Sequence, residues 1–462
     1  MTAPTLIRRA SWVLSMDPAV GDLPDCDVLI EDGIIAAVGP DLGGYGRLAP
    51  ADAEIIDGTD RIVVPGFIDT HRHLWQTALR NLAADWTLSQ YLVGVLGTMA
   101  PAYHPEDVYA GNLLGALEAL DHGITTILDW SHCALGSPEH VDAAICALER
   151  SGIRAVFAYG NGAAIWIDRA SSADWSQLRR LREHGSYGAG RITLAAALRG
   201  PDFGTVDVAV EDWRAARELG LPISVHIGVA GFADRPVSAL AGRGLLGPDT
   251  TYVHCSRLHD DELQMIADTG GAASVAAEVE MHMGHGYPPT GRLLAVGIRP
   301  SLSIDVCTGI GGDMFTAMRT TLAMQRALDN DRVIRAGGAP QHLELTARDV
   351  LEFATIQGAR TLGLADRAGS VTPGKDADLV LLRTDQLNML PVNNPVASVA
   401  LAANTRNIDV VMVGGTVLKR RGELTGADLA EVRKLAEASR DRLIAAVPGA
   451  ALGGAWQPSA DW

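Results

Sequence analysis

The chain lacks long apolar segments, and its 462 residues include only five cysteines. The cysteines are odd in number, scattered and without a Cys-x-x-Cys pair, which favours a reducing compartment without a disulfide framework or a cysteine metal site. No apolar run approaches the roughly 20 residues needed to span a bilayer. Residues 1–17 lack the uninterrupted apolar core and small-residue cleavage site of a secretory signal. We therefore expect a cytoplasmic protein with no membrane partner.

Basic residues are outnumbered, since 38 Lys and Arg stand against 55 Asp and Glu, a formal net charge of −17. Such a surface repels phosphate backbones, so a nucleic acid partner is not expected. With 47% hydrophobic and 20% charged residues, the composition is that of an ordinary globular protein. The length suits one large domain and a smaller companion.

Short β-rich stretches occupy the two ends of the chain. Residues 5–64 contain DVLIEDGIIAAVGP, two apolar runs joined by a turn at residues 31–33, which predicts a hairpin. Residues 374–383 and 408–420 are similar. Neither end alone has enough strands to bury a sheet face, so the two ends should meet in one small β-sandwich domain. The predicted division is 1–64 with 368–425 for this domain, 65–367 for a large inserted domain, and 426–462 for a C-terminal helix and tail.

The middle of the chain alternates short apolar runs with amphipathic segments. Runs such as GITTILDW, GIRAVFAY and LPISVHIG are nearly continuous in apolar residues, and segments such as PEHVDAAICALERS have helical periodicity. This alternation predicts a parallel sheet covered by helices. Counting PGFIDTH as the first, about eight strands can be placed, the number on which a (β/α)8 barrel of the TIM type closes. A doubly wound open sheet is the alternative, disfavoured because no glycine-rich dinucleotide fingerprint follows a strand.

Polar residues follow the apolar runs at the predicted carboxyl ends of four strands. His71 and His73 end the first strand, and because strand residues i and i+2 point to the same side, both should project together. Further along, LPISVHIG gives His226, TTYVHC gives His254 and RPSLSID gives Asp305. Active sites of barrels lie at the carboxyl ends of the strands, so these side chains should gather at one place.

This set of imidazoles with a carboxylate has the chemistry of a hydrolytic metal centre. Three histidines and an aspartate suit Zn²⁺ or Fe²⁺ and leave a coordination position open for water. The metal lowers the pKa of that water towards about 7, so hydroxide is available at neutral pH. In this interpretation Asp305 binds the metal and takes the proton, while His254 orients the water or the substrate. One divalent metal is expected, with Zn²⁺ first and Fe²⁺ as the alternative.

The motifs PGFIDTHRH, SVHIG, VHCSRL and SLSID, with GKDADLVLL near the end, resemble the amidohydrolase superfamily. The branch that the chain resembles most contains cytosine deaminase-like and triazine hydrolase-like enzymes, and the resemblance covers nearly the whole chain. It implies that a single metal is held by His71, His73, His226 and Asp305, with His254 beside it. It also implies a homo-oligomer, a dimer or larger.

The sequence departs from this branch where the substrate would be handled. Many deaminases of the branch carry a glutamate three residues after the fifth-strand histidine to protonate the departing amine, and here that position is Val229. Arg257 replaces the second histidine of a His-x-x-His motif, and Val279 and Glu280 replace a Ser-Asn pair. No lysine ends the fourth strand, so a carboxylated lysine bridging two metals is not expected. We infer retained metal hydrolysis with an altered substrate.

Residues near the predicted strand ends supply candidates for the missing roles. Glu280 is the first candidate for the proton donor, with His282 or His285 in its place otherwise. Trp75 and Gln76 would offer a flat wall and an amide to a planar ring, although core packing would explain a tryptophan equally well. The predicted substrate-binding residues are Trp75, Gln76, Trp86, Arg257, His282 and His285.

Arginines form a separate group of candidates. Arg199, Arg257 and Arg292 fall near strand ends or their loops. They would suit an anionic group on the substrate, and surface ion pairs would explain them as well. Arg72 points to the opposite side of the first strand from the two histidines, and we expect it to form a structural ion pair.

Together these features predict a metal-dependent hydrolase on a (β/α)8 barrel with a small-molecule substrate. It would cleave a non-peptide carbon–nitrogen bond of a small cyclic amidine, amino-heterocycle or lactam by attack of metal-bound hydroxide. The predicted catalytic residues are Asp305, His254 and Glu280. One alternative is a hydrolytic dehalogenase or dealkylaminase of an azine ring, since halide leaves without a proton. Another, from a different class, is a barrel that binds a ligand or metal without catalysis.

Overall fold

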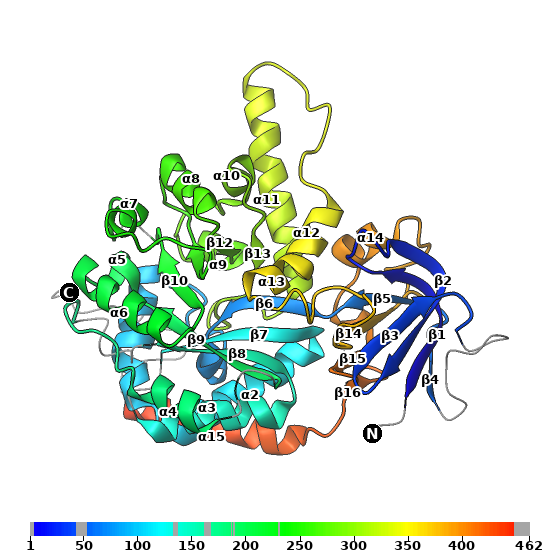
Figure 1. Cartoon of the computed structure of the whole chain (residues 1–462), viewed down its shortest axis with the longest axis horizontal. Helices are drawn as coiled ribbons and strands as arrows, with labels where there is room; N and C mark the ends of the chain where they lie inside the picture. Colours follow the sequence, from blue (N-terminus) through cyan, green and yellow to red (C-terminus); the bar gives the residue numbers. More distant parts are fainter. Residues whose placement is uncertain are drawn as a thin grey trace.

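The computed structural model describes residues 4–42, 53–132, 137–160, 168–185, 187, 190–229 and 232–447. The larger of its two bodies is a barrel with surrounding helices, and the smaller is a mixed sheet that lies to one side (Figure 1). Over these ranges, no helix combines the length and the apolar character that a bilayer span requires.

Eight strands form the barrel sheet, and adjacent strands run parallel. In chain order they are β6 (Phe67–Arg72), β7 (Ile124–Ser131), β8 (Arg154–Gly160), β9 (Ile192–Leu198), β10 (Ile223–Ile227), β11 (Thr250–His254), β12 (Ala272–Val275) and β13 (Ser301–Leu302). The sheet closes between its first strand and the segment after its last. The Asp305 N–H donates to the His71 carbonyl and the His73 N–H donates to the Asp305 carbonyl, each at 2.9 Å. The predicted (β/α)8 barrel is therefore confirmed.

Helices follow the strands around the barrel (Figure 1). They are α2 (Pro105–Asp121), α3 (Pro138–Ser151), α4 (Ser176–His184), α5 (Gly200–Phe203), α6 (Val206–Glu218), α7 (Pro236–Ala241), α8 (Asp260–Asp268), α9 (Ala277–His282), α10 (Thr290–Ala295), α11 (Met314–Arg335), α12 (Ala347–Phe353) and α13 (Ile356–Thr361). α3 ends at Gly152, whose φ of 77° is the left-handed C-cap conformation that glycine adopts readily. The C-terminal helix α15 (Leu429–Ala446) packs along α2, where the Ser439 hydroxyl donates to Asp107 at 2.5 Å.

The connection from β6 to α2 lies over the carboxyl ends of the strands. It contains η1 (Leu74–Leu79), α1 (Leu88–Tyr91), η2 (Leu92–Met99) and η3 (Ala100–Ala102). Thr87 is the N-cap of α1, and its hydroxyl accepts the Gln90 N–H in a capping box. The Leu88 N–H donates to the Met283 carbonyl at 3.0 Å, so this connection is fastened to the segment after α9.

As predicted, the two ends of the chain meet in one small β-domain, and its strands form a nine-stranded mixed sheet. Its strands are β1 (Thr5–Leu14), β2 (Asp22–Glu31), β3 (Ile34–Gly39), β4 (Glu54–Asp57), β5 (Arg61–Pro65), β14 (Leu379–Arg383), β15 (Ile408–Val413), β16 (Thr416–Arg420) and β17 (Glu423–Leu424). Between β14 and β15 lie α14 (Pro395–Ala397), η5 (Ser398–Ala402) and η6 (Thr405–Asn407). β5 pairs antiparallel with β14, which joins the N-terminal and C-terminal strands directly. Apolar side chains from both ends, including Ile7, Val28 and Leu379, form a core of their own.

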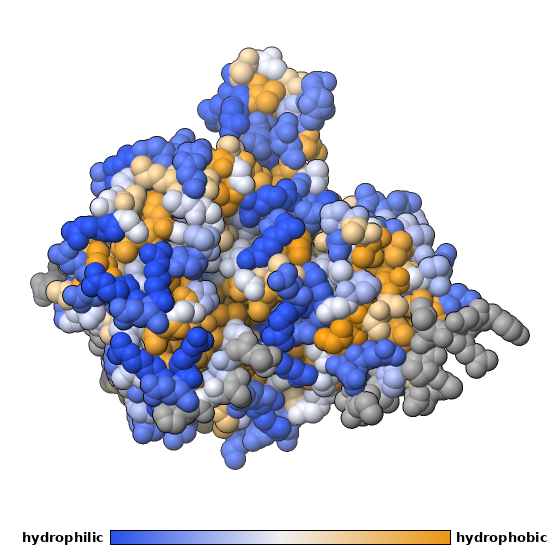
Figure 2. Space-filling view, viewed as in Figure 1, coloured by the Kyte–Doolittle hydropathy of each residue, from blue (hydrophilic) through white to orange (hydrophobic). Residues whose placement is uncertain are grey.

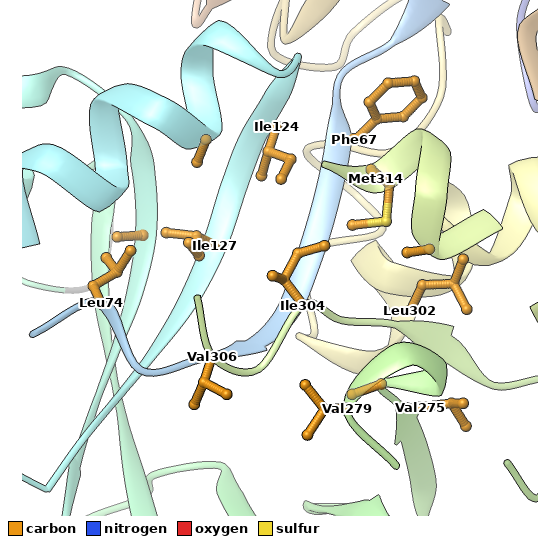
Figure 3. Packing of buried hydrophobic residues seen from close by; sticks show 14 of the residues in the cluster. Phe67, Leu74, Ile124, Ile127, Val275, Val279, Leu302, Ile304, Val306 and Met314 are labelled. Atoms are coloured by element: carbon orange, nitrogen blue, oxygen red, sulfur yellow. The ribbon is translucent and has the colours of Figure 1, made fainter. Parts of the chain in front are cut away.

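The first barrel strand is fastened on both sides. Figure 3 shows apolar side chains of β6, β7 and the segment after β13 filling the space between these elements. Phe67 of β6 also stacks edge-on against Phe315 of α11, with ring centroids 5.2 Å apart. On the other side, the buried Arg72 guanidinium donates to Glu118 of α2 at 2.5 Å and to Cys307 Sγ at 2.9 Å. This is the predicted structural ion pair, and it holds the end of β6 in place.

α11 projects beyond the neighbouring helices (Figure 1). Apolar side chains lie among hydrophilic ones at the far end of this projection (Figure 2), where Val333, Ile334 and Leu343 are 39%, 59% and 49% exposed. Exposed apolar clusters are typical of contact surfaces.

Candidate active site

The four predicted metal ligands meet at the carboxyl ends of β6 and β10 and just after β13. The His71 and His73 Nε2 atoms lie 3.3 and 3.4 Å from Asp305 Oδ1, and His226 Nε2 lies 3.1 Å from His71 Nε2. All four side chains are buried. The i, i+2 spacing at the end of β6 thus brings two imidazoles to one place.

The separations of these donor atoms fit a metal ion. Two Zn–N bonds of about 2.1 Å at a tetrahedral angle place their nitrogen atoms about 3.4 Å apart, close to the 3.1 to 3.4 Å found in this cluster. His73 Nδ1 lies 2.7 Å from the Trp130 carbonyl, so its hydrogen is on Nδ1 and the Nε2 lone pair faces the cluster. The described residues therefore include a site that can hold a divalent metal.

Burial keeps the clustered imidazoles neutral. It lowers the pKa of His73 to about 3 and also lowers the pKa of His71 and of His226. Burial alone would raise the pKa of Asp305, but the hydrogen bond with His71 and the neighbouring imidazoles outweigh it and hold that pKa below its usual range. Neutral imidazole nitrogens and an ionised carboxylate are the protonation states that bind metals.

Two of the strand-end residues have a left-handed backbone conformation. The φ angle is 75° at His254 and 67° at Asp305, which costs on the order of 1 kcal/mol or more for a residue that carries a side chain. The backbone of Asp305 is held there by its hydrogen bonds with His71 and His73. Strain that the surrounding structure maintains is typical of functional positions.

His254 links the cluster to Glu280. Its Nε2 lies 3.7 Å from Asp305 Oδ2, and its Nδ1 lies 3.3 Å from Glu280 Oε1. The same oxygen accepts the Ala276 N–H at 2.9 Å, and Glu280 Oε2 has no hydrogen-bond partner among the described residues. Burial lowers the pKa of His254, but the hydrogen bond with Glu280 and the charge of Asp305 raise it above its usual value overall. Glu280 therefore lies behind His254, at the nitrogen remote from Asp305.

A small chamber lies beside the cluster. Its volume is about 30 Å³, room for about two water molecules. The described residues that line it are His73, Leu88, Tyr91, Leu92, Leu96, His132, Phe203, His226, Val229, His254, Met283, His285, Asp305 and Val306. A ring-sized ligand is larger than this space, so part of the wall, which includes residues of α1 and η2, has to shift when one binds.

Three predicted substrate-binding residues lie behind the chamber wall. Trp75 is fully buried, and its indole N–H donates to His132 Nδ1 at 3.2 Å. The Gln76 amide donates to the Tyr91 hydroxyl at 2.6 Å. Trp86 packs against η2. The chamber wall, as far as the structure describes it, includes none of these three, and they instead support His132, Tyr91 and η2.

The remaining predicted substrate-binding residues lie in different surroundings. They are Arg257, His282 and His285. His282 is exposed at the end of α9. Arg257 is exposed too, and its Nε donates to the His285 carbonyl at 3.1 Å. His285 is buried and lines the chamber. Of these three, the structure brings His285 to the cluster and leaves the other two on the surface.

The three arginines considered for an anionic substrate all have protein partners. Arg199 donates to two backbone carbonyls of residues 168–171. Arg292 donates to the Asp260 carboxylate at 2.8 Å, and Arg257 binds a loop carbonyl as described above. These guanidiniums hold loops in place, which explains them without an anionic substrate.

The chamber also contains residues that the sequence analysis did not include. His132 follows the apolar run GITTILDW at the end of β7, the same signal that marked the other strand-end histidines. Tyr91, Phe203 and Met283 come from connecting segments, where no periodicity marks them. Val229 lies in the chamber wall, so the position at which the resemblance implied a glutamate faces the chamber as an apolar group.

Histidines and an aspartate gathered at the carboxyl ends of a (β/α)8 barrel define the class of barrel metallohydrolases. The profile of the amidohydrolase family matches residues 62–418, which is most of the chain. The chain therefore belongs to the amidohydrolase family, as its motifs predicted.

Two similar sequences are deaminases. The 5'-deoxyadenosine deaminase of Methanothermobacter thermautotrophicus is 30% identical over 432 residues, which cover 90% of this chain and 94% of that protein. The 5-methylthioadenosine/S-adenosylhomocysteine deaminase of Desulforudis audaxviator is 28% identical over 453 residues, which cover 96% of this chain and 100% of that protein. With the family membership, these relatives confirm the predicted enzyme class, a metal-dependent hydrolase of carbon–nitrogen bonds.

Solved structures share the fold. A zinc-bound adenosine deaminase from Xanthomonas campestris superposes with a TM-score of 0.82 at 24% identity and covers 96% of this chain and 99% of its own. An atrazine chlorohydrolase from Arthrobacter aurescens, complexed with zinc, has a TM-score of 0.80 at 24% identity and covers 94% and 100%. Both likenesses extend over the barrel and the mixed sheet.

Proposed function

We propose that the protein is a zinc-dependent hydrolase that removes the amino group of a small amino-heterocycle. The observation that carries this proposal is the convergence of His71, His73, His226 and Asp305 beside a small chamber. The names of the similar deaminases, which act on 5'-deoxyadenosine and related compounds, support the substrate class. Zinc is proposed because similar structures contain it and the donor atoms suit it.

In this mechanism His71, His73, His226 and Asp305 would hold the metal, which would supply a water molecule of lowered pKa. Asp305 Oδ2 accepts the proton that the attacking water releases and passes it to the departing amino group, which leaves as ammonia. His254 Nε2, 3.7 Å from the same oxygen, hydrogen-bonds the oxygen of the attacking water, which becomes part of the substrate. The apolar part of the chamber wall excludes further water from the small volume that remains.

Glu280 acts through His254. Its Oε1 binds the Nδ1 hydrogen, so His254 Nε2 stays directed towards Asp305 and the chamber. Among the described residues, the chamber wall includes His254 and not Glu280. We therefore propose that Glu280 positions His254 and does not itself donate a proton to the substrate. The substrate then contacts His254, and Glu280 fixes the orientation of that imidazole.

Val229 favours a second candidate function, the hydrolytic removal of halide from an azine ring. Its side chain faces the chamber where related deaminases carry the glutamate that protonates an amine. Halide departs as an anion and takes no proton, so this reaction does not require an acid at residue 229.

Metal analysis and product analysis test these proposals separately. Purified native protein should contain about one equivalent of zinc, and the His71→Ala/His73→Ala double variant should contain none. Amino-azines, chlorinated azines, cyclic amidines and lactams are then screened for released ammonia and chloride. Ammonia supports deamination and chloride supports the second candidate. A native protein that takes up no divalent metal on reconstitution refutes both.

We also propose that the protein is a homo-oligomer and acts in the cytoplasm. The partly exposed Val333, Ile334 and Leu343 on the α11 projection offer a contact surface between copies. The cysteines that the structure describes are free thiols, which suits a reducing compartment. Light scattering of the native protein and of Ile334→Glu tests the assembly. The variant should dissociate into smaller species, and an unchanged mass would exclude this surface.

A further inference from the structure

We propose that His285 recognises the substrate through a hydrogen bond between its imidazole and a ring nitrogen, and that the substrate is an uncharged aromatic nitrogen heterocycle. This inference rests on the proposed function and narrows its substrate class. It also distinguishes His285 from His282 and Arg257, which the sequence pattern groups with it.

The imidazole of His285 is buried without a protein partner for either nitrogen. The residue is 2% exposed, and neither Nδ1 nor Nε2 has a hydrogen-bond partner within the described ranges. Buried polar atoms are nearly always paired, because an unpaired one loses its hydration without compensation. The imidazole lines the chamber next to the cluster, so the chamber is where its partner binds.

The backbone around His285 holds the ring at this place. Its N–H donates to the Glu280 carbonyl at 2.9 Å, and its carbonyl accepts the Arg257 Nε–H at 3.1 Å. Gly284 and Gly286 on either side have φ angles of 83° and 133°, which residues with side chains rarely adopt. The ring stands edge-on to His254, with centroids 4.7 Å apart and an interplanar angle of 84°. Arg257 thus positions His285 from the surface.

The composition of the chamber wall selects an uncharged partner. Among the described residues the wall includes no lysine or arginine that could pair with a phosphate or carboxylate. Burial also lowers the pKa of His285 to about 3, so the imidazole is neutral and presents one N–H donor and one lone pair. Much of the remaining wall is apolar, with Leu88, Leu92 and Met283 from the covering segments. An aromatic ring with an acceptor nitrogen and apolar substituents fits this combination.

A hydrogen bond from His285 to a ring nitrogen would also assist the reaction. When water attacks a ring carbon, electron density moves onto the adjacent ring nitrogen. An N–H already directed at that nitrogen stabilises this density as it grows. Both binding and turnover should therefore depend on His285.

The test compares two planar probes of similar shape, diaminotriazine and diaminobenzene, which differ in the presence of ring nitrogens. Their binding is measured by calorimetry with zinc-loaded and zinc-free protein, at a pH where both rings are uncharged. The wild type should bind diaminotriazine about tenfold more tightly than diaminobenzene. His285→Phe keeps a ring in place without nitrogens and should bind both probes equally. His285→Asn keeps a donor and an acceptor and should recover part of the preference.

A matched control is His342→Phe, which removes an exposed histidine beyond α11 and should keep the wild-type preference. His285→Phe should melt at no lower a temperature than the wild type, because it leaves no buried unpaired nitrogen. The inference is overturned if His285→Phe still binds diaminotriazine more tightly than diaminobenzene by the wild-type factor. It is also overturned if the melting temperature of this variant is markedly lower than that of the wild type. A wild type that binds neither probe overturns the substrate class. If the protein holds metal but releases neither ammonia nor chloride, the proposed function fails, while the preference in zinc-free protein still tests His285.

Discussion

Replacing Glu280 by glutamine isolates the effect of its charge on His254. Glu280 Oε1 accepts hydrogen bonds from the Ala276 N–H at 2.9 Å and from His254 at 3.3 Å. A glutamine oxygen can keep both. The amide NH₂ would then stand in place of Oε2, which has no partner among the described residues, so no existing hydrogen bond is lost.

The expected magnitude follows from this geometry. A hydrogen bond to a charged group contributes about 1.5–3 kcal/mol and a neutral one about 0.5–1.5 kcal/mol. The difference, about 1–1.5 kcal/mol, corresponds to a rate change of about tenfold. Because Glu280 acts through His254 and away from the metal ligands, kcat should fall about tenfold while KM and metal content stay unchanged.

Steady-state kinetics with metal analysis of the same samples checks this outcome. Glu278→Gln is a matched control, since Glu278 lies on the same helix, is only partly buried and interacts with the charge of Asp313 instead. It should keep the wild-type kcat. Full activity in Glu280→Gln, or loss of metal from it, would refute the positioning role.

Removing the metal with a chelator should lower the melting temperature, since a ligand that binds the native state stabilises it; an unchanged calorimetric transition would count against the metal site. Burial raises the pKa of Asp129 from 3.8 to about 7, so the folded state favours the protonated carboxyl. The contribution of this group to the free energy of unfolding is therefore full below pH 3.8 and is lost as the pH rises to about 7. The free energy of unfolding of Asp129→Asn, compared with that of the wild type, should therefore be more favourable at about pH 8 than at acid pH by up to about 4 kcal/mol. Urea unfolding measures this difference, and the same difference at both pH values would contradict the prediction. A methyl group on Gly94 would clash with the Trp86 ring, so Gly94→Ala should lose about 1–3 kcal/mol of stability and have a lower kcat/KM, because η2 forms a chamber wall. If neither value changes, the packing of η2 does not shape the site.

The strand-end histidines could be predicted because strand geometry alone decides where they point. His71 and His73 share a side at i and i+2, and closure of a parallel barrel brings distant strand ends such as His226 and Asp305 to one face. His132 obeys the same rule at the end of β7, and applying the rule to every strand would have included it. The metal cluster therefore depends on a local pattern and on one global property, the closed barrel.

The chamber wall could not be predicted, because it depends on how connecting segments pack. Trp75 lies close to the ligands in sequence, yet it packs behind His132. His282 and His285 are three residues apart, but α9 ends at the first of them and two glycines then turn the chain, so one side chain is exposed and the other is buried. No hydrophobic period encodes such a turn, and histidine is common in both surroundings.

The candidate metal site lies on the seam of the barrel. Among the described residues, the backbone–backbone hydrogen bonds that join the first strand to the last part of the sheet are those between Asp305 and His71 and His73, and β13 itself contains only two residues, Ser301–Leu302. An ion bound by these side chains would connect the first barrel strand, β6, to the segment after the last strand, β13. Amide hydrogen exchange at His73 and Asp305 should therefore slow when metal is added, because an ion bound by these side chains stabilises the closed barrel against local opening.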